Sequence, residues 1–205
     1  LAKNNYQTIF ASALPPLLAS GQALPAQTVV LTFDDGYADF YENAFPILKK
    51  YNLKTTVFLA TDFVGGRMNN HQGQPLKILS WPQIKELAKS SQVEFQPHSL
   101  SHRELTKLSA EEIKNEIFSS RREIQSQLNS GNRVFAYPKG GYNQVVIETL
   151  RGGGMAGAFT VEEGLVNSDT DRFRLKRNSI DSATSFTQFK AKLNPAVAVF
   201  VKLFR

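Results

Sequence analysis

Short apolar strands alternate with amphipathic helical segments along most of the chain, and this alternation limits the folds that the chain can adopt. β-Branched and apolar runs predict buried strands at residues 28–33, 55–60, 93–96, 133–137, 156–160 and 174–180. Helical spacing of apolar residues predicts helices at residues 37–51, 81–88, 109–128, 144–150 and 184–193. Strands that alternate with helices usually run parallel, joined by crossover connections. We therefore expect an α/β protein, either a closed barrel or an open doubly wound sheet, with its functional residues at the carboxyl ends of the strands.

The chain length and the absence of a linker or repeat predict one domain over residues 1–205. Residues 1–27 are expected to form an N-terminal edge segment with a short helix. Residues 28–180 carry the motifs, and residues 181–205 contain a C-terminal helix. Residues 64–77 are rich in Gly, Asn and Gln, which predicts a polar loop that overhangs the site.

The composition and charge of the chain limit the kinds of molecule and surface that it is expected to bind. The formal charge of +6 favours anionic envelope surfaces, and no nucleic-acid-binding motif accompanies it. The longest apolar stretches, residues 9–18 and 195–203, are shorter than the about 20 residues that a transmembrane helix needs. The chain contains no Cys, so disulfides and a cysteine nucleophile are excluded and any metal must be held by His, Asp or Glu.

Two adjacent carboxylates, Asp34 and Asp35, follow the first predicted strand and precede Gly36. Such a pair is costly to ionise unless a cation or a proton lies between the two acids. Side chains alternate along a strand, and Gly36 offers the turn that lets the two acids take different directions. One acid can then bind a cation while the other handles a proton. A helix N-cap or an Asx turn is the plainer interpretation of the same residues.

Two of the three histidines, His98 and His102, lie four residues apart directly after another predicted strand. On a helical turn this spacing brings both imidazoles to one side, within reach of one metal ion. Ser99 or Ser101 can supply a hydrogen bond that orients a ring. Taken alone, the pair is also compatible with two unrelated histidines on a polar loop.

The two clusters are more specific together than apart. One Asp and two His ligands leave coordination positions open for water and substrate, which is typical of catalytic metal sites. The neighbouring carboxylate, Asp34, is then available as a general base.

In this combination the residues resemble the polysaccharide deacetylase family, carbohydrate esterase family four, and most of all its bacterial exopolysaccharide deacetylases. The sequence TFDDG at residues 32–36 matches the first family motif, and HSLSH at 98–102 matches the second. The stretch FAYPKGGYN at residues 135–143 resembles the third, which lines the substrate groove. The resemblance covers residues 28–180.

The resemblance implies a distorted, incomplete (β/α) barrel and the metal-dependent hydrolysis of N-acetyl groups on polysaccharide that contains N-acetylglucosamine, with release of acetate. Such an enzyme is a polysaccharide N-deacetylase, a hydrolase of non-peptide carbon–nitrogen bonds. Its place of action is extracellular, periplasmic or on the cell envelope, after removal of any signal peptide.

The resemblance also implies the roles of individual residues. Asp34 is the catalytic base, and the backbone N–H of Lys139 is an oxyanion donor. The implied metal ligands are Asp35, His98 and His102, which usually hold zinc, although Co²⁺, Ni²⁺ or another divalent ion also serves. The residues expected to line the substrate groove are Tyr137, Pro138 and Tyr142.

Three positions depart from the family pattern. Ala136 stands where the family has an Arg that orients the base, so Asp34 must rely on other partners or on the metal alone. Lys139 replaces an aromatic residue. No His follows His102 to act as the general acid, and the only other histidine is His71. Asp34 is therefore expected to return the proton itself, with His71 or a water as the lesser option.

These departures keep three alternatives open. An O-acetyl polysaccharide esterase would use the same site and need less help from an acid. A catalytically weakened homologue would retain only sugar binding. An envelope scaffold would use the basic surface without a metal.

Overall fold

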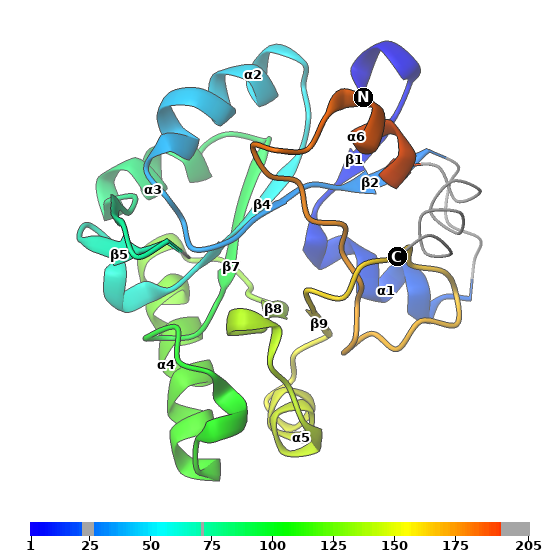
Figure 1. Ribbon diagram of the computed structural model, residues 1–205. Coiled ribbons are helices and arrows are strands. Elements are labelled where there is room, and N and C mark those ends of the chain that lie inside the picture. Colours follow the sequence, from blue (N-terminus) through cyan, green and yellow to red (C-terminus); the bar gives the residue numbers. More distant parts are fainter. Residues whose placement is uncertain (22–26, 71, 194–205) are drawn as a thin grey trace.

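Parallel strands form the centre of the molecule and helices surround them (Figure 1). The computed structural model describes residues 1–21, 27–70 and 72–193. The strands are β1 Gln7–Ile9, β2 Thr28–Val30, β3 Thr32–Phe33, β4 Thr55–Leu59, β5 Arg67–Asn69, β6 Pro75–Lys77, β7 Val93–Pro97, β8 Val134–Ala136 and β9 Gly157–Phe159. The α-helices are α1 Leu14–Ala19, α2 Phe45–Lys50, α3 Trp81–Ala88, α4 Ala110–Leu128, α5 Gln144–Gly152 and α6 Phe186–Leu193, and a π-helical turn, Phe40–Ala44, precedes α2.

The central strands pair in parallel, which confirms the predicted α/β character. β3 pairs with β4, and β4 pairs with β7, while β1–β2 and β8–β9 form two further parallel ladders. The carboxyl ends of β3, β4 and β7 therefore meet at one edge, where the two motif clusters begin. Among the described residues the ladders stay separate, so hydrogen bonding does not join them into a closed barrel.

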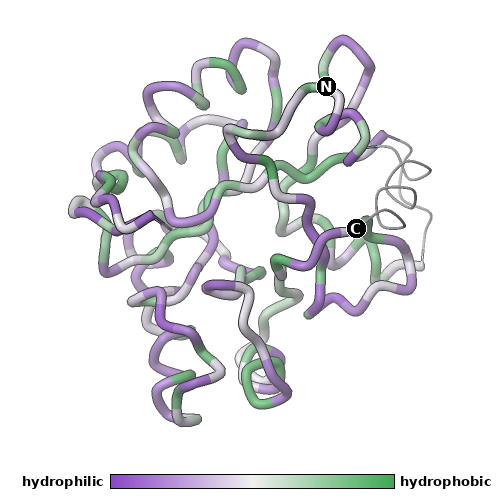
Figure 2. Tube along the Cα trace, viewed as in Figure 1, coloured by the Kyte–Doolittle hydropathy of each residue, from purple (hydrophilic) through white to green (hydrophobic). Residues whose placement is uncertain are grey.

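The core lies between the strands and the helices around them. All five residues of β4 are buried, as a strand covered on both faces requires. The longest helix, α4, turns a stripe at helical spacing inward, with Ile113, Ile117 and Ile124 fully or almost fully buried. Hydrophobic residues are concentrated on the central strands, and hydrophilic residues are frequent on the outer helices and loops (Figure 2).

The N-terminal segment packs on the core through its short helix, α1, and also contributes a strand. Residues 7–9 form a strand that pairs with β2, which the sequence did not predict. Ala11, Leu14 and Leu18 are buried in a cluster with residues of β4, β8 and β9. Ser12 donates through its N–H and hydroxyl to the Glu94 carboxylate at 3.0 and 2.7 Å, which fastens the segment to β7.

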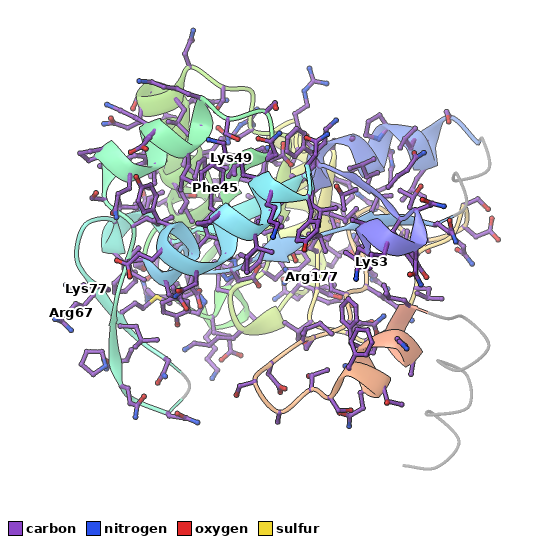
Figure 3. All side chains as sticks on the ribbon, turned by 90° about the horizontal axis from the view of Figure 1, so that it is seen from above. Lys3, Phe45, Lys49, Arg67, Lys77 and Arg177 are labelled. Carbon is purple, nitrogen blue, oxygen red and sulfur yellow. The ribbon has the colours of Figure 1, made fainter. Side chains whose placement is uncertain are left out.

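Two further segments differ from the prediction. β5 and β6 form an antiparallel hairpin, in which Met68 is buried and the Asn70 carboxamide oxygen accepts the N–H groups of Gln72 and Gln74. Figure 3 shows its Arg67 and Lys77 at the margin of the molecule. Residues 174–180 do not form a strand, and only Leu175 bridges to β9.

The predicted C-terminal helix is present as α6, and residues 194–205 lie outside the described part of the chain. A bilayer-spanning helix needs both length and an apolar surface, and no helix within residues 1–21, 27–70 and 72–193 combines the two.

Candidate metal centre

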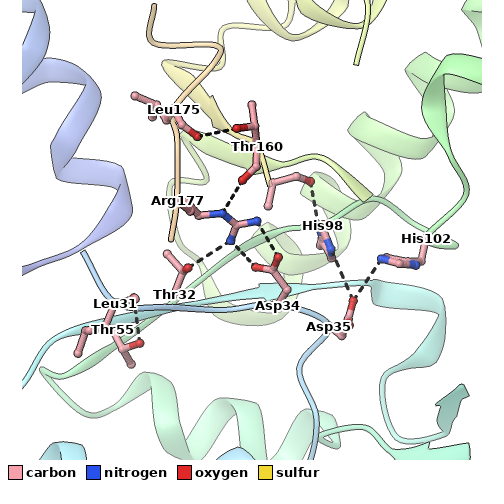
Figure 4. A network of polar contacts seen from close by, with 11 residues as sticks. Leu31, Thr32, Asp34, Asp35, Thr55, His98, His102, Thr160, Leu175 and Arg177 are labelled. Carbon is pink, nitrogen blue, oxygen red and sulfur yellow. Dashed lines mark hydrogen bonds and ion pairs between the residues drawn. The ribbon is translucent and has the colours of Figure 1, made fainter. Parts of the chain in front are cut away.

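The side chains of the first two motifs converge at the carboxyl ends of neighbouring strands (Figure 4). Asp34 and Asp35 follow β3, while His98 and His102 lie on the loop that follows β7. Since β4 pairs with both strands, the two loops lie at the same edge. Asp35 and His98 are 63 residues apart in the sequence. The two clusters nevertheless form one site.

The distances within this site fit a single metal ion. The Asp35 Oδ1 atom lies 3.5 Å from His98 Nε2 and 3.3 Å from His102 Nε2. One donor atom from each of the three residues lies within 4.8 Å of the other two. Two ligand bonds of about 2 Å at a tetrahedral angle place their donor atoms about 3.3 Å apart. The distances from Asp35 to the two histidines are thus those expected between ligands of one tetrahedral ion.

Electrostatics also favour a cation between these atoms. Asp35 Oδ1 is buried and has no hydrogen-bond partner among the described residues, a costly state for a carboxylate oxygen. Burial, followed by the neighbouring His98, lowers the pKa of His102 to about 4, so its imidazole is neutral at pH 7. A neutral imidazole offers a nitrogen lone pair. The donor set therefore fits a divalent metal.

The tautomer of His98 is set by a backbone contact. His98 Nδ1 lies 2.8 Å from the carbonyl oxygen of Ala136, so Nδ1 carries the proton and donates it. Nε2 is the ring nitrogen that faces Asp35 and is the one placed to bind a metal. A hydrogen bond of this kind is the usual support of a metal-ligating His.

The backbone at the site takes a conformation that residues other than Gly rarely adopt. The φ angles of Asp35, Ser99 and His102 are 69°, 68° and 56°, all in the left-handed region. Ser99 stabilises its turn by accepting the His102 N–H at 3.0 Å through its hydroxyl oxygen. Such strain costs about 1–3 kcal/mol per residue and concentrates at functional sites.

A buried glutamate on α4, Glu116, holds the histidine loop. Its carboxylate accepts the N–H groups of Leu100 and Ser101 at 3.1 and 2.9 Å, and also the Ser101 hydroxyl. The side chain thereby fixes the backbone between the two histidines. The sequence analysis missed this residue, although a charged residue on the inward stripe of an amphipathic helix was a usable signal.

Arg177 supplies the partner that Asp34 was expected to find elsewhere. Its guanidinium donates to both carboxylate oxygens of Asp34 at 2.7 Å, and also to the Thr160 carbonyl at 2.9 Å (Figure 4). Burial raises the pKa of Asp34, but the charge of Arg177, with smaller contributions from the two histidines, outweighs it and keeps the pKa below its usual value. Asp34 is thus ionised and oriented by a residue 143 positions away in the sequence.

The other predicted site residues differ in their accessibility. Lys139 is exposed at a tight turn with φ of 57°. This turn requires Gly140, because a Cβ there would lie 2.2 Å from Val161 Cγ2. Tyr142 is half-buried and stacks on Tyr137, with ring centroids 5.0 Å apart.

Two of the predicted groove residues are not accessible. Tyr137 is fully buried, and its hydroxyl donates to the Phe173 carbonyl, so its ring supports Tyr142 and offers no surface to a sugar. Pro138 is also buried. His71 lies outside the described residues.

Replacing Glu116 with Ala should weaken zinc binding about 10–100-fold, because the loop between the two histidines loses its support. The free energy of unfolding of the metal-free protein should fall by roughly 1–3 kcal/mol, since three partly buried donors lose their acceptor. Competition with a chromophoric chelator measures the first quantity, and urea denaturation measures the second.

Glu116→Gln keeps an acceptor oxygen and should recover most of both losses. Glu111→Ala is the matched control, because Glu111 lies on the same helix with its side chain 89% exposed. Zinc affinity of the Glu116→Ala variant equal to that of the wild type would contradict the role of this side chain.

Comparison with known proteins agrees with this geometry. The family model described as polysaccharide deacetylase matches residues 21–158. The chain is 30% identical over 161 residues to poly-beta-1,6-N-acetyl-D-glucosamine N-deacetylase of Staphylococcus epidermidis, covering 75% of this chain and 54% of that protein. A Bacillus subtilis relative is covered over 65% of its length. The chain thus spans between half and two thirds of these two curated relatives.

Two solved structures share the fold over nearly the whole chain. The deacetylase PplD of Streptococcus pyogenes, solved in complex with acetate, has a TM-score of 0.83 and 27% identity, with 95% of this chain and 82% of that chain covered. IcaB of Ammonifex degensii has a TM-score of 0.79 and 25% identity, with 93% and 83% covered. The matched family model and these neighbours show that the chain belongs to the polysaccharide deacetylase family.

Proposed function

We propose that this chain is a metal-dependent polysaccharide N-deacetylase that releases acetate from the N-acetylglucosamine units of a polymer. The observation that carries the proposal is the convergence of Asp35, His98 and His102 with the Arg177-bound carboxylate of Asp34 beside them. The Staphylococcus relative named for poly-beta-1,6-N-acetyl-D-glucosamine supports the β-1,6-linked polymer as the first substrate to test.

Asp35, His98 and His102 would hold the metal, and this donor set suits zinc, with cobalt or nickel as substitutes. When bound, the metal would supply Lewis acidity toward the acetyl carbonyl and toward the attacking water. Asp35 and His98 are buried, whereas the His102 side chain is partly exposed.

Asp34 would move the proton. One carboxylate oxygen accepts a proton from the water that adds to the acetyl carbon, while Arg177 keeps the carboxylate in place. The carbon–nitrogen bond then breaks, acetate leaves, and the same oxygen returns the proton to the sugar nitrogen. The side chain of Asp34 is 29% exposed, so it can reach a substrate from its place beside the ligands.

The backbone N–H of Lys139 would stabilise the oxyanion, and the accessible surface of Tyr142 would contact the sugar. An O-acetyl esterase is the second candidate, because besides His98 and His102 the sequence has only His71 as a histidine that could act as an acid for an amine leaving group. Parallel assays on N-acetylated and O-acetylated oligosaccharides distinguish the two activities.

Purified protein loaded with zinc should release acetate from β-1,6-linked N-acetylglucosamine oligomers, and chelation should abolish the release until zinc is restored. Asp34→Asn should keep zinc but lose turnover by about 100–10,000-fold, because it removes the group that carries the proton. The Asp35→Ala variant should lose both zinc binding and turnover. An enzyme-coupled acetate assay and a zinc determination on each protein provide the measurements.

Activity that survives full removal of the metal would contradict the metal-dependent mechanism. Near wild-type turnover by Asp34→Asn would show that another group is the base. Lys85→Ala, at a surface position of α3, serves as the control for nonspecific effects of substitution.

Arg177→Lys should lower kcat by about 10–100-fold and leave zinc affinity unchanged. Lysine retains the charge but cannot donate to both oxygens of Asp34, so the carboxylate loses its fixed orientation. Arg177 makes none of its hydrogen bonds with the three ligands, which is why the two measurements should separate. A parallel fall in zinc affinity would indicate a general collapse of the site.

A further inference from the structure

The loop at residues 160–162, directly after β9, contacts two parts of the centre that come from different strands. It hydrogen-bonds the segment that contains Arg177. It also packs against the turn Pro138–Gly140, because a Cβ at Gly140 would lie 2.2 Å from Cγ2 of Val161. This turn carries the Lys139 N–H that is the proposed oxyanion donor. The loop therefore connects that donor with the arginine that holds the proposed base.

The contacts of this loop with Arg177 involve its main chain. The Thr160 carbonyl oxygen accepts the Arg177 Nε–H at 2.9 Å (Figure 4), and the Glu162 carbonyl oxygen accepts the Arg177 backbone N–H at 2.9 Å. Thr160 is fully buried, and its hydroxyl oxygen also accepts the Glu162 N–H at 3.1 Å. The backbone at Glu162 and the guanidinium that orients Asp34 are thus fixed relative to each other.

The side chain of Glu162 extends this connection to the segment that follows the turn. Its Oε1 atom accepts the Tyr142 hydroxyl at 2.5 Å, and this hydrogen bond raises the pKa of the Tyr142 phenol. The Tyr142 ring also stacks on Tyr137, which directly precedes the turn and is fully buried. Tyr142 is therefore held at both its hydroxyl and its ring.

The loop that carries His102 also packs against this part of the chain. A Cβ at Gly141 would lie 3.3 Å from Glu104 Cγ and 3.6 Å from Thr106 Oγ1, and Glu104 is two residues beyond His102. The segment that carries Lys139 is thus in contact with the loop of a metal ligand and with the loop that holds Arg177. A shift of either loop would move the Lys139 N–H relative to the centre.

We propose that Glu162 is a positioning residue of the reaction, which fixes the Lys139 N–H relative to the Asp34 carboxylate through its bond with Tyr142. The inference rests on the proposed function, because it gives Glu162 a task in that reaction. An oxyanion donor is effective about 2.7–3.1 Å from the developing charge. A turn that is free to move loses this distance, while the metal ligands keep their places.

Tyr142→Phe is the sharpest variant, because it removes the hydroxyl and keeps both the ring and the charge of Glu162. In the zinc-loaded protein it should lower kcat about tenfold, the effect of one lost hydrogen bond to a charged group, with KM and zinc affinity unchanged. Glu162→Ala should lose the same factor, and Glu162→Gln should recover most of the rate because its amide oxygen still accepts. The variant that combines Tyr142→Phe with Glu162→Ala should lose no more than either alone, since both remove one bond.

Glu163→Ala is the matched control, because it removes an equal charge from the neighbouring position, where the side chain pairs with Lys192. Acetate, the product, provides a readout that does not depend on turnover. NMR titration of acetate into the zinc-loaded protein should show about tenfold weaker binding in Tyr142→Phe, since a carboxylate oxygen of acetate would occupy the place of the oxyanion.

A wild-type kcat in Tyr142→Phe, additive losses in the combined variant, a loss confined to KM or an equal loss in Glu163→Ala would overturn the role of Glu162. Absence of acetate release by the wild type from every oligomer would instead contradict the proposed function. The acetate titration would then decide the positioning role, and equal affinities of the wild type and Tyr142→Phe would overturn it.

Discussion

The buried carboxylate of Asp35 is the constraint on which the rest of the site depends. Its Oδ1 atom is buried between the Nε2 atoms of His98 and His102 and has no hydrogen-bond partner among the described residues, which is unfavourable for a carboxylate without a cation. The backbone strain at Asp35 and His102 adds to the cost. Such an arrangement persists only where the surrounding structure enforces it and a ligand compensates for it, and a divalent metal has the required charge and bond length.

Support for the centre comes from three separate segments of the chain. Glu116 on α4 fixes the loop between the histidines, and the carbonyl of Ala136 at the end of β8 orients His98. Arg177, beyond β9, holds Asp34. Ala136 occupies the place at which the family resemblance led us to expect an arginine. The guanidinium that orients Asp34 comes instead from Arg177, in another part of the chain.

The parts of the site that were predictable are those set by local sequence. Asp34 and Asp35 directly follow an apolar strand, His98 and His102 follow another, and the parallel arrangement of such strands brings their ends together. Arg177 was not predictable in this way, because its contact with Asp34 spans 143 residues and depends on the path of an irregular segment. The burial of Tyr137 was also missed, since the sequence around an aromatic residue in a motif does not indicate whether its ring faces the substrate or the core. The alternation of strand and helix predicted the parallel fold, but not β1, whose pairing with β2 depends on the tertiary position of the N-terminus.

The most direct test of the account is anomalous diffraction at the zinc edge from crystals of the zinc-loaded protein. We expect one strong peak about 2.0–2.2 Å from Asp35 Oδ1 and from the Nε2 atoms of His98 and His102, with Asp34 outside the coordination sphere. A peak held by other residues, or no peak between these three side chains at saturating zinc, would contradict the assignment of the metal centre.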